Sequence, residues 1–415
     1  MINTASFPVP PRVIVHTAEP SGLGHYVSKF VLALDASGIP AILYCPENSN
    51  DQQEAREAGI EVVHAAPRAT ANSGLLARLL RNFRFLTRSI FSLARLLRKG
   101  DVVHFQGMLH LPLGFAFLLI ARLRGASIVL TAHDPLPHRW RFPGSLQWIE
   151  RAMLGLSYRS CDRVIAHNHY GRNVLLREFH LRDEQIHVIP HGWYPEAGAS
   201  ETPWPLFDRL QLLAFGSIRK NKGLHLAIAA LQQLDGRARV PVHLTIAGHC
   251  DPAEQTYWRE CKQLIGNNAN VRLIERRIED SEIQGIMAQH HALILPYENF
   301  SSESGVATLA LSYSRPIIAT PAGGLAELVT GARCGVLISA PSPDDVADAI
   351  LQAIGLGSEQ LHKMGTDGNR FIREMRSWKL VADLSGEVYS ELMQENACLQ
   401  TRDFELRVRS DHKSS

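Results

Sequence analysis

The sequence predicts an α/β protein made of two doubly wound domains, each a parallel sheet with helices on both faces. Short β-branched runs alternate with longer helical stretches along the chain, which is the pattern of parallel α/β sheets. Thirteen such runs are more than one sheet usually holds. A linker-like stretch rich in Pro, Ala and Ser, EAGASETPWP at 196–205, separates the seventh run from the eighth. A length of 415 residues also fits more than one domain.

The expected strands follow the apolar, β-branched runs in chain order. Seven precede the linker, at residues 12–17, 41–45, 61–64, 101–105, 127–131, 163–167 and 187–190. Six follow it, at residues 211–216, 242–248, 271–274, 291–296, 316–320 and 335–338. We therefore expect a first domain over 1–195 and a second over 206–376. A helix at 377–395 comes after the second sheet is complete and is expected to return to the first domain. The polar tail 396–415 lacks periodicity and is expected to be disordered.

Composition excludes several classes of protein. The content of 45% hydrophobic and 20% charged residues is that of a folded globular chain, and a net charge of +2 gives no general argument for nucleic-acid binding. None of the six cysteines forms a C-x-x-C pair, so we expect reduced thiols of a cytosolic protein rather than a metal or disulfide framework. The N-terminus does not resemble a signal peptide, and no apolar run is long enough to span a bilayer.

Candidate functional residues of the first domain lie where expected strands end, because open α/β sheets bind ligands at that edge. Gly22 and Gly24 follow the first strand and permit a tight turn into a helix, but they complete neither a G-x-G-x-x-G nor a P-loop pattern. An ordinary strand-to-helix turn explains them equally well. His133 follows the strand SIVLT, beside Asp134. A single His is commonly structural. Because His133 stands at the edge of the sheet where ligands bind, a functional role is equally plausible.

The second domain offers two candidate anion-binding elements. Its first strand ends at Gly216 and is followed by the basic loop RKNKG, with Arg219 and Lys222, and then by a helix. Fixed positive charge beside a helix N-terminus suits a diphosphate, although a solvated basic loop is the alternative. The segment SSESGV delivers the amides of residues 304–306 to the same edge, at the start of a helix expected over 306–314 and capped by Ser301 or Ser302. Together the two elements predict a two-sided clamp for a pyrophosphate.

The ordered motifs resemble those of a known enzyme family. The matching segments are SGLGHY, TAHDPLPH, VIPHGWYP, FGSIRKNKG, LTIAGH, LPYENFSSESGV, RPIIATPAGGLAELV and RSWKLVADLSGEVY. They span residues 12–390 and resemble the GT-B-fold glycosyltransferases of family 4, which are retaining enzymes that use nucleotide sugars. The family usually carries two glutamates eight positions apart, where this chain has Ser301 and Leu309. The chain is therefore similar to a subgroup without the glutamate pair, in which Glu303 or Glu298 is a candidate to take over one donor contact.

The resemblance implies a reaction and roles for the residues. A sugar passes with retention from a nucleoside diphosphate sugar to a glycan or lipid-linked saccharide, in bacterial polysaccharide assembly. No cofactor beyond this co-substrate is implied. No convincing Asp-x-Asp stands at a strand end. The resemblance therefore favours a metal-independent mechanism, in which charge on the β-phosphate is stabilised by Arg219, Lys222 and the amides at Ser304, Gly305 and Val306.

The remaining roles also rest on the resemblance. It places His133 near the transferred sugar, Gly22 and Gly24 beside the acceptor and donor phosphate, and Arg277 near the base. Gly216 is expected at the donor, and Glu303 is the candidate there in place of a family glutamate. Two alternatives stay open. One is a catalytically silent protein of this fold that binds a nucleotide sugar or a partner enzyme, which the missing glutamate pair motivates. The other is a nucleotide-sugar epimerase.

A basic amphipathic stretch covers residues 67–100, which contain no Asp or Glu. At 100° per residue its arginines fall on one half of a helical wheel and its leucines on the other. The leucines of such a helix usually pack on the sheet, here the sheet of the first domain. The cationic face lacks acidic partners, which predicts attraction to an anionic membrane surface through residues 75–99. We accordingly expect a cytoplasmic protein, peripheral on the inner face of the plasma membrane.

Overall fold

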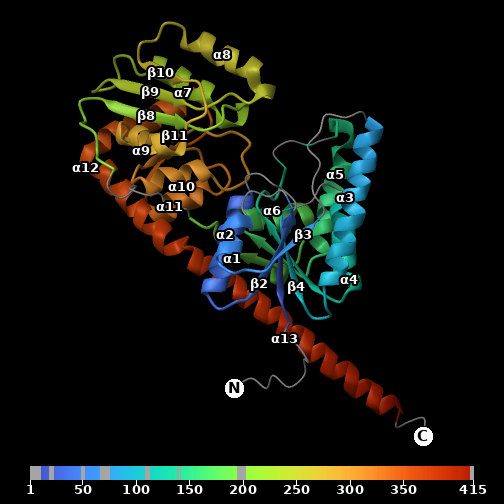
Figure 1. The fold of residues 1–415 in the computed structure, drawn as a ribbon. Helices are drawn as coiled ribbons and strands as arrows, with labels where there is room; N and C mark the ends of the chain where they lie inside the picture. The colour runs from blue at the N-terminus through green and yellow to red at the C-terminus, as the bar shows by residue number, and fades with distance from the viewer. Residues whose placement is uncertain are drawn as a thin grey trace. The chain divides into compact units, whose positions relative to one another are not determined.

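The computed structural model describes residues 11–17, 23–47, 52–65, 75–107, 113–137, 140, 142–193 and 202–411. The chain divides into two compact units, which are treated separately below. Unit 1 comprises residues 1–167, 172–192 and 378–415, and unit 2 comprises residues 168–171 and 193–377. Each unit contains one parallel sheet with helices on both faces, which confirms the predicted α/β architecture (Figure 1).

The sheet of unit 1 has seven parallel strands in the order β3-β2-β1-β4-β5-β6-β7. Their bounds are β1 Val13–His16, β2 Ala41–Pro46, β3 Val62–Ala65, β4 Val102–Gln106, β5 Ser127–Ala132, β6 Arg163–Ala166 and β7 Ile186–Val188. The five central strands are almost wholly buried, as parallel strands covered on both faces must be, whereas the edge strands β3 and β7 are only partly buried. The chain reverses its direction across the sheet between β1 and β4, so this is the point where a ligand is expected.

Helices of unit 1 cover the two faces in separate groups. One face carries α3 Leu75–Leu96, α4 Leu113–Leu123, α5 Gln147–Arg159 and α6 His169–Phe179, whose buried side chains share a core with β1, β4 and β5. The other face carries α1 Leu23–Ala36, α2 Gln52–Glu57 and α13 Trp378–Asp411. Helix α13 follows unit 2 in the chain and packs along α1 (Figure 1).

Helix α13 differs from the sequence expectation, which placed disorder from residue 396. The helix continues to Asp411, and no proline or glycine interrupts it after position 396. Asn396 is moreover held to the sheet, because its Nδ2 donates to Ser127 Oγ at 2.7 Å. The preceding residue, Glu395, forms an ion pair with Arg163. These contacts anchor a segment whose polar composition alone suggested a free tail.

The sheet of unit 2 has six parallel strands in the order β10-β9-β8-β11-β12-β13. They are β8 Leu210–Phe215, β9 Val242–Ala247, β10 Val271–Ile274, β11 Ala292–Leu295, β12 Ile317–Ala319 and β13 Gly335–Leu337. One face packs against α7 Leu224–Gln232, α8 Gln255–Ile265 and the first half of α12 Pro343–Met375, which kinks at Gly357. The other face packs against α9 Asp280–Ala288, α10 Gly305–Ser312 and α11 Leu325–Ala332. The direction reverses between β8 and β11, where loops 216–223 and 296–304 follow adjacent strands.

Candidate functional site

The loop after β8 is shaped by two glycines with positive φ. Gly216 has φ +100° and Gly223 has φ +63°. A Cβ added to Gly223 would lie only 1.9 Å from the carbonyl oxygen of Pro296, at the end of the neighbouring strand β11. Glu298 adds a further tie, since its amide donates to the carbonyl of Asn221 at 2.9 Å. The loops that follow β8 and β11 are therefore locked together, as their adjacent strands require.

Lys222 points into the small pocket formed at this junction, which we call the β8 pocket. Its lining includes Gly216 and the polar and aromatic side chains of Ser217, Lys222 and Tyr297. The ammonium of Lys222 lies 3.8 Å from the centroid of the Tyr297 ring, in a cation–π contact. The aromatic ring orients the cation without neutralising it, so the charge stays available for an anion.

Helix α10 starts beside the β8 pocket. Ser304 is its N-cap, with an extended backbone (φ −95°, ψ 102°), and its Oγ accepts a hydrogen bond from the Ala307 amide at 3.2 Å. The expectation of a cap at position 301 or 302 is wrong, because the helix begins at Gly305. A Cβ on Gly216 would touch Val306 at 3.4 Å, which places the first turn of α10 against the loop after β8. The amides of Gly305 and Val306 have no intrahelical carbonyl partners in this position.

Arg219 and Arg277 lie apart from this arrangement. Arg219 donates through Nε to Asp251, with 3.2 Å between Nε and Oδ2, and its side chain is 45% exposed. Arg277 is exposed beyond the end of β10. Neither residue lines the β8 pocket. The structure thus brings together Lys222, Gly216 and the first turn of α10, while the charge of Arg219 is shared with a carboxylate.

Glu303 has two strong partners within unit 2. Its side chain is 8% exposed and accepts from Arg376, with 2.8 Å between Oε2 and Nη1. Its other oxygen, Oε1, accepts from Asn168 Nδ2 at 2.6 Å. The carboxylate therefore joins the loop before α10 to the end of α12 and to the start of α6. The sequence offers no signal for these long-range partners.

A second carboxylate caps helix α6 from a distant part of the chain. Glu327, in the first turn of α11, accepts from the amides of His169 and Tyr170 at 2.9 and 2.6 Å. Asn168 completes the cap, because its Oδ1 accepts from the Gly171 amide at 2.7 Å. Negative charge at a helix N-terminus is favourable. These contacts explain why residues 168–171 cluster with unit 2 although the rest of α6 belongs to unit 1.

In unit 1 His133 follows β5 and belongs to a chain of hydrogen bonds that we call the histidine line, which runs from Gln106 through His133 and His167 to Ile189. Its Nδ1 lies 2.9 Å from Nε2 of His167, which follows β6, and its Nε2 lies 3.0 Å from Oε1 of Gln106, at the end of β4. At the far end His167 donates through Nδ1 to the carbonyl of Ile189 at 3.0 Å. The rings of Tyr26 and His191 pack against this pair.

The protonation of this line follows from its acceptors. The two imidazoles form three hydrogen bonds, namely His167 to the Ile189 carbonyl, His167 to His133, and His133 to Oε1 of Gln106. Each bond needs one proton on a ring nitrogen, because both end groups are oxygens that only accept. Two neutral imidazoles carry two such protons, so the third proton would make one of the rings positively charged. Burial, followed by the nearby His167, lowers the pKa of His133 well below its usual value. A neutral pair is satisfied when Gln106 turns its amide and donates to His133 Nε2. His133 is thus a neutral group held in one tautomer from both sides.

Sequence reasoning found only part of this cluster. His133 was singled out, but His167, His191 and Gln106 were missed, although each also stands at or just past the end of a strand. Of the two glycines expected at this edge, Gly22 lies outside the described residues and Gly24 is the second residue of α1.

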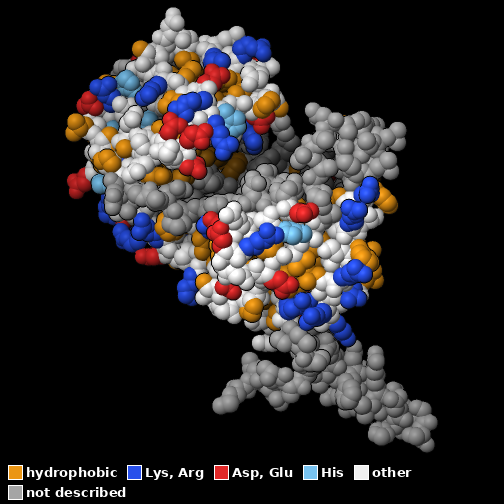
Figure 2. All heavy atoms as spheres, viewed as in Figure 1, with side chains coloured by type: hydrophobic (Ala, Val, Ile, Leu, Met, Phe, Trp, Pro, Cys, Tyr) orange, Lys and Arg blue, Asp and Glu red, His pale blue; other side chains and the backbone are white. Residues whose placement is uncertain are grey.

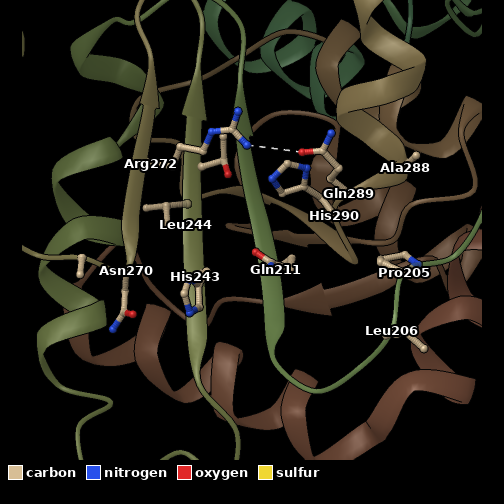
Figure 3. A pocket seen from close by; sticks show the side chains of 12 residues that line it. Pro205, Leu206, Gln211, His243, Leu244, Asn270, Arg272, Ala288, Gln289 and His290 are labelled. Atoms are coloured by element: carbon tan, nitrogen blue, oxygen red, sulfur yellow. Dashed lines mark hydrogen bonds between the residues drawn. The ribbon is translucent and has the colours of Figure 1, made fainter.

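A larger cavity lies at the opposite edge of the unit 2 sheet. It has a volume of about 450 Å³ and is lined by residues at the amino ends of β8, β9 and β10, among them Gln211, His243 and Arg272 (Figure 3). Arg272 reaches across to Gln289, with 3.4 Å between Nη1 and Oε1. None of the residues predicted from the sequence lines this cavity. Within the described part of the chain, His, Cys, Asp and Glu side chains form no group of three suited to a metal ion.

Comparison with known proteins agrees with the geometry. The family described as Glycosyltransferase Family 4 matches residues 20–196, and the family described as Glycosyl transferases group 1 matches residues 209–355. Together they cover most of both units. The chain belongs to the family 4 glycosyltransferases. The resemblance deduced from the motifs is therefore confirmed at family level, and the enzyme class is that of glycosyltransferases acting with nucleotide sugars.

Individual relatives span much of this glycosyltransferase. An MMP α-(1→4)-mannosyltransferase of Mycolicibacterium hassiacum is 26% identical over 71% of this chain and 72% of its own length. An α-maltose-1-phosphate synthase of Mycolicibacterium smegmatis is 27% identical over 67% of this chain and 76% of its own. Among solved structures, Anabaena Alr3699/HepE in complex with UDP has a TM-score of 0.67 at 14% identity, covering 92% of this chain and 100% of that one. The last likeness establishes the GT-B fold.

Proposed function

We propose that this glycosyltransferase binds the diphosphate of a nucleoside diphosphate sugar between Lys222 and the first turn of α10. The observation that carries the proposal is the contact of three elements at the switch point of the unit 2 sheet. Lys222 and Gly216 line one pocket, and Val306 lies in van der Waals distance of the position of a Gly216 Cβ. A cation and two unpaired helix amides suit an anion of two phosphates.

In the proposed reaction the bond between the anomeric carbon and the β-phosphate oxygen breaks, and the oxygen of an acceptor hydroxyl forms the new glycosidic bond with retention. The proton of that hydroxyl passes to the leaving diphosphate. Negative charge builds up on the leaving diphosphate. Lys222 and the amides of Gly305 and Val306 stabilise this charge more in the transition state than in the bound donor, without a metal ion. Arg219 joins them only if it leaves Asp251, to which it is bound at 3.2 Å.

His133 is the proposed contact for the transferred sugar. It is neutral, because burial disfavours its charged form, and both of its ring nitrogens have hydrogen-bonding partners in the structure. A sugar hydroxyl therefore reaches Nε2 by replacing the amide of Gln106. The acceptor we propose is a glycan or a lipid-linked saccharide in polysaccharide assembly at the cytoplasmic face of a membrane. The names of the two relatives above, a mannosyltransferase and a maltose-phosphate synthase, support a saccharide as acceptor.

A panel of nucleoside diphosphate sugars in a thermal-shift assay tests donor binding, because a ligand that binds the native state raises stability. Lys222→Ala should weaken donor affinity by about 10- to 150-fold, which corresponds to one charged hydrogen bond of about 1.5–3 kcal/mol. Lys220→Ala is the matched control, since Lys220 belongs to the same turn and does not line the β8 pocket. If Lys222→Ala and the unmodified protein had equal donor affinity, the diphosphate would not bind at the β8 pocket and the proposal would be wrong.

A second candidate function is donor binding without transfer. Ser301 and Leu309 occupy the positions where the family usually has glutamates, which is the observation that favours it. Purified protein that binds a nucleotide sugar but neither transfers nor hydrolyses it, with any saccharide acceptor tried, would support this alternative. Conversion of the donor sugar without an acceptor would instead indicate an epimerase.

A further inference from the structure

The outer surface of α3 and α4 carries an unusual concentration of exposed apolar side chains. Of the large hydrophobic residues that are exposed in the described part of the chain, most lie between positions 83 and 156. Phe83 and Phe91 on α3 are 64% and 58% exposed. Leu119 and Leu123 on α4 are 58% and 72% exposed. The two helices pack side by side on the same face of the unit 1 sheet, so these residues belong to one surface.

Arginines alternate with these apolar residues on α3. At 100° per residue, Phe83, Phe91, Arg84, Arg88 and Arg95 fall within an arc of about 140°. The opposite side of the helix supplies buried leucines to the sheet core, as expected from the sequence. Arg95 lies over the Phe91 ring at 4.2 Å, so the cationic and apolar groups are in direct contact. Figure 2 shows Lys and Arg side chains interspersed with hydrophobic ones along this edge of unit 1.

The surface lacks compensating negative charge. Between Glu61 and Asp134 the only acidic residue is Asp101, which is buried and paired with Arg12 at 2.7 Å. No carboxylate among the described residues pairs with the three outward arginines of α3, Arg84, Arg88 and Arg95. On α4, Arg122 is neutralised by Asp162, with 2.8 Å between Nη2 and Oδ1.

We infer that α3 and α4 form a docking surface for an anionic lipid bilayer, with Phe83, Phe91, Leu119 and Leu123 inserted at the headgroup boundary. Guanidinium groups that flank apolar side chains match a surface that presents phosphates above acyl chains. A second copy of this chain fits less well. A symmetric contact through the same patch would bring the arginines of one copy against those of the other. The inference depends on this surface alone and not on the donor pocket.

Vesicle binding by the full chain tests the inference. Flotation with phosphatidylcholine vesicles, with and without 30% phosphatidylglycerol (about a third anionic), should show partition that requires the anionic lipid and falls as salt rises. The variant Arg84→Gln, Arg88→Gln, Arg95→Gln should lose roughly 100-fold in partition coefficient, since each cation near the surface contributes about fivefold. A second variant, Phe91→Ser with Leu123→Ser, should also lose partition while its arginines remain.

The matched control removes three exposed arginines from unit 2, Arg239→Gln, Arg259→Gln and Arg333→Gln, for the same change in net charge. It should partition like the unmodified chain. Equal partition of the α3 arginine variant and this control would overturn the inference, as would equal binding to neutral and anionic vesicles. A third outcome would also overturn the inference. If the unmodified chain dimerised with rising concentration but did not bind vesicles, and the α3 arginine variant stayed monomeric, the surface would be the contact with a second copy of the chain. The salt series uses the unmodified protein, so the test does not depend on the folding of any variant.

Discussion

Replacing Glu303 by Gln should destabilise unit 2 strongly, because it leaves a buried cation without its partner. The carboxylate and the guanidinium of Arg376 lie 2.8 Å apart, and both side chains are 8% exposed. Gln keeps the size of Glu and can still accept from Asn168, so the substitution removes charge and little else. The role of Glu303 as a donor contact, predicted from the sequence, is tested by the same variant.

The magnitude follows from the geometry. At 2.8 Å and an effective dielectric constant of about 20, the Coulomb attraction is about 6 kcal/mol. The cost of removing both groups from water offsets part of this attraction. Loss of one partner of such a buried pair typically costs about 3–5 kcal/mol. For a unit of this size, that loss lowers Tm by roughly 10 °C. The double variant Glu303→Gln, Arg376→Met removes both charges and should recover much of the loss.

The assay is urea unfolding followed by hydrogen exchange of the α10 and α11 amides, which reports on unit 2. Glu298→Gln is the control from the same loop, since Glu298 is 28% exposed and lies 3.6 Å from His225. We expect it to cost less than about 1 kcal/mol. If Glu303→Gln unfolded like the unmodified protein and lost donor affinity instead, the carboxylate would be a donor contact and the structural argument would be refuted.

Two further predictions concern stability. Burial lowers the pKa of His16 and of His104 to about 3, so the unfolded chain binds more protons than the folded one between pH 3 and 6.5. The stabilisation is complete above pH 6.5 and is lost as pH falls, so that at pH 5 the two residues together cost unit 1 about 4 kcal/mol. The measurement is the free energy of opening of the β1 and β4 amides, obtained from hydrogen exchange after correction for the intrinsic exchange rate at each pH. An opening free energy that is the same at pH 7 and pH 5 would contradict this prediction. Gly223→Ala should cost several kcal/mol more than Gly236→Ala in urea unfolding. Both have positive φ, but only the Cβ at position 223 meets a carbonyl oxygen, at 1.9 Å, whereas nothing lies within 4 Å at position 236. Equal losses would mean that β11 moves freely away from the loop.

The strands were predictable because each is a short β-branched run that needs no partner to be recognised. All thirteen expected runs are strands in the structure, with ends that differ by a few residues. The cap of α10 was less predictable, since three serines lie within the four residues before the helix and each is a plausible cap by type. Backbone geometry decides among them, and only Ser304 combines an extended conformation with a bond to the Ala307 amide.

Partners that meet through tertiary folding escaped the sequence analysis. Glu303 and Arg376 are 73 positions apart, and Glu327 and His169 are 158 positions apart. Residue type places each of them equally well on a solvated surface. His133 was recognised by its position after a strand, but the line formed with His167 and Gln106 depends on the order in which strands β4, β5 and β6 lie in the sheet.

By the resemblance, Ser301 and Leu309 stand where the family usually has glutamates, and we expect this difference to affect the β8 pocket little, because that pocket depends on sheet topology. Its walls are the loops after β8 and β11, which are adjacent in the sheet and tied by Glu298 and Gly223. Leu309 is half-buried and packs against the core to which α10 and α11 contribute. In the proposed function, an apolar residue at position 309 would favour binding of the diphosphate, because it places no negative charge near the anion. We expect the difference to bear on recognition of the rest of the donor. Variants at positions 301 and 309 should therefore change which nucleotide sugar the protein prefers. Variants of Lys222 should instead weaken the affinity for every nucleotide sugar.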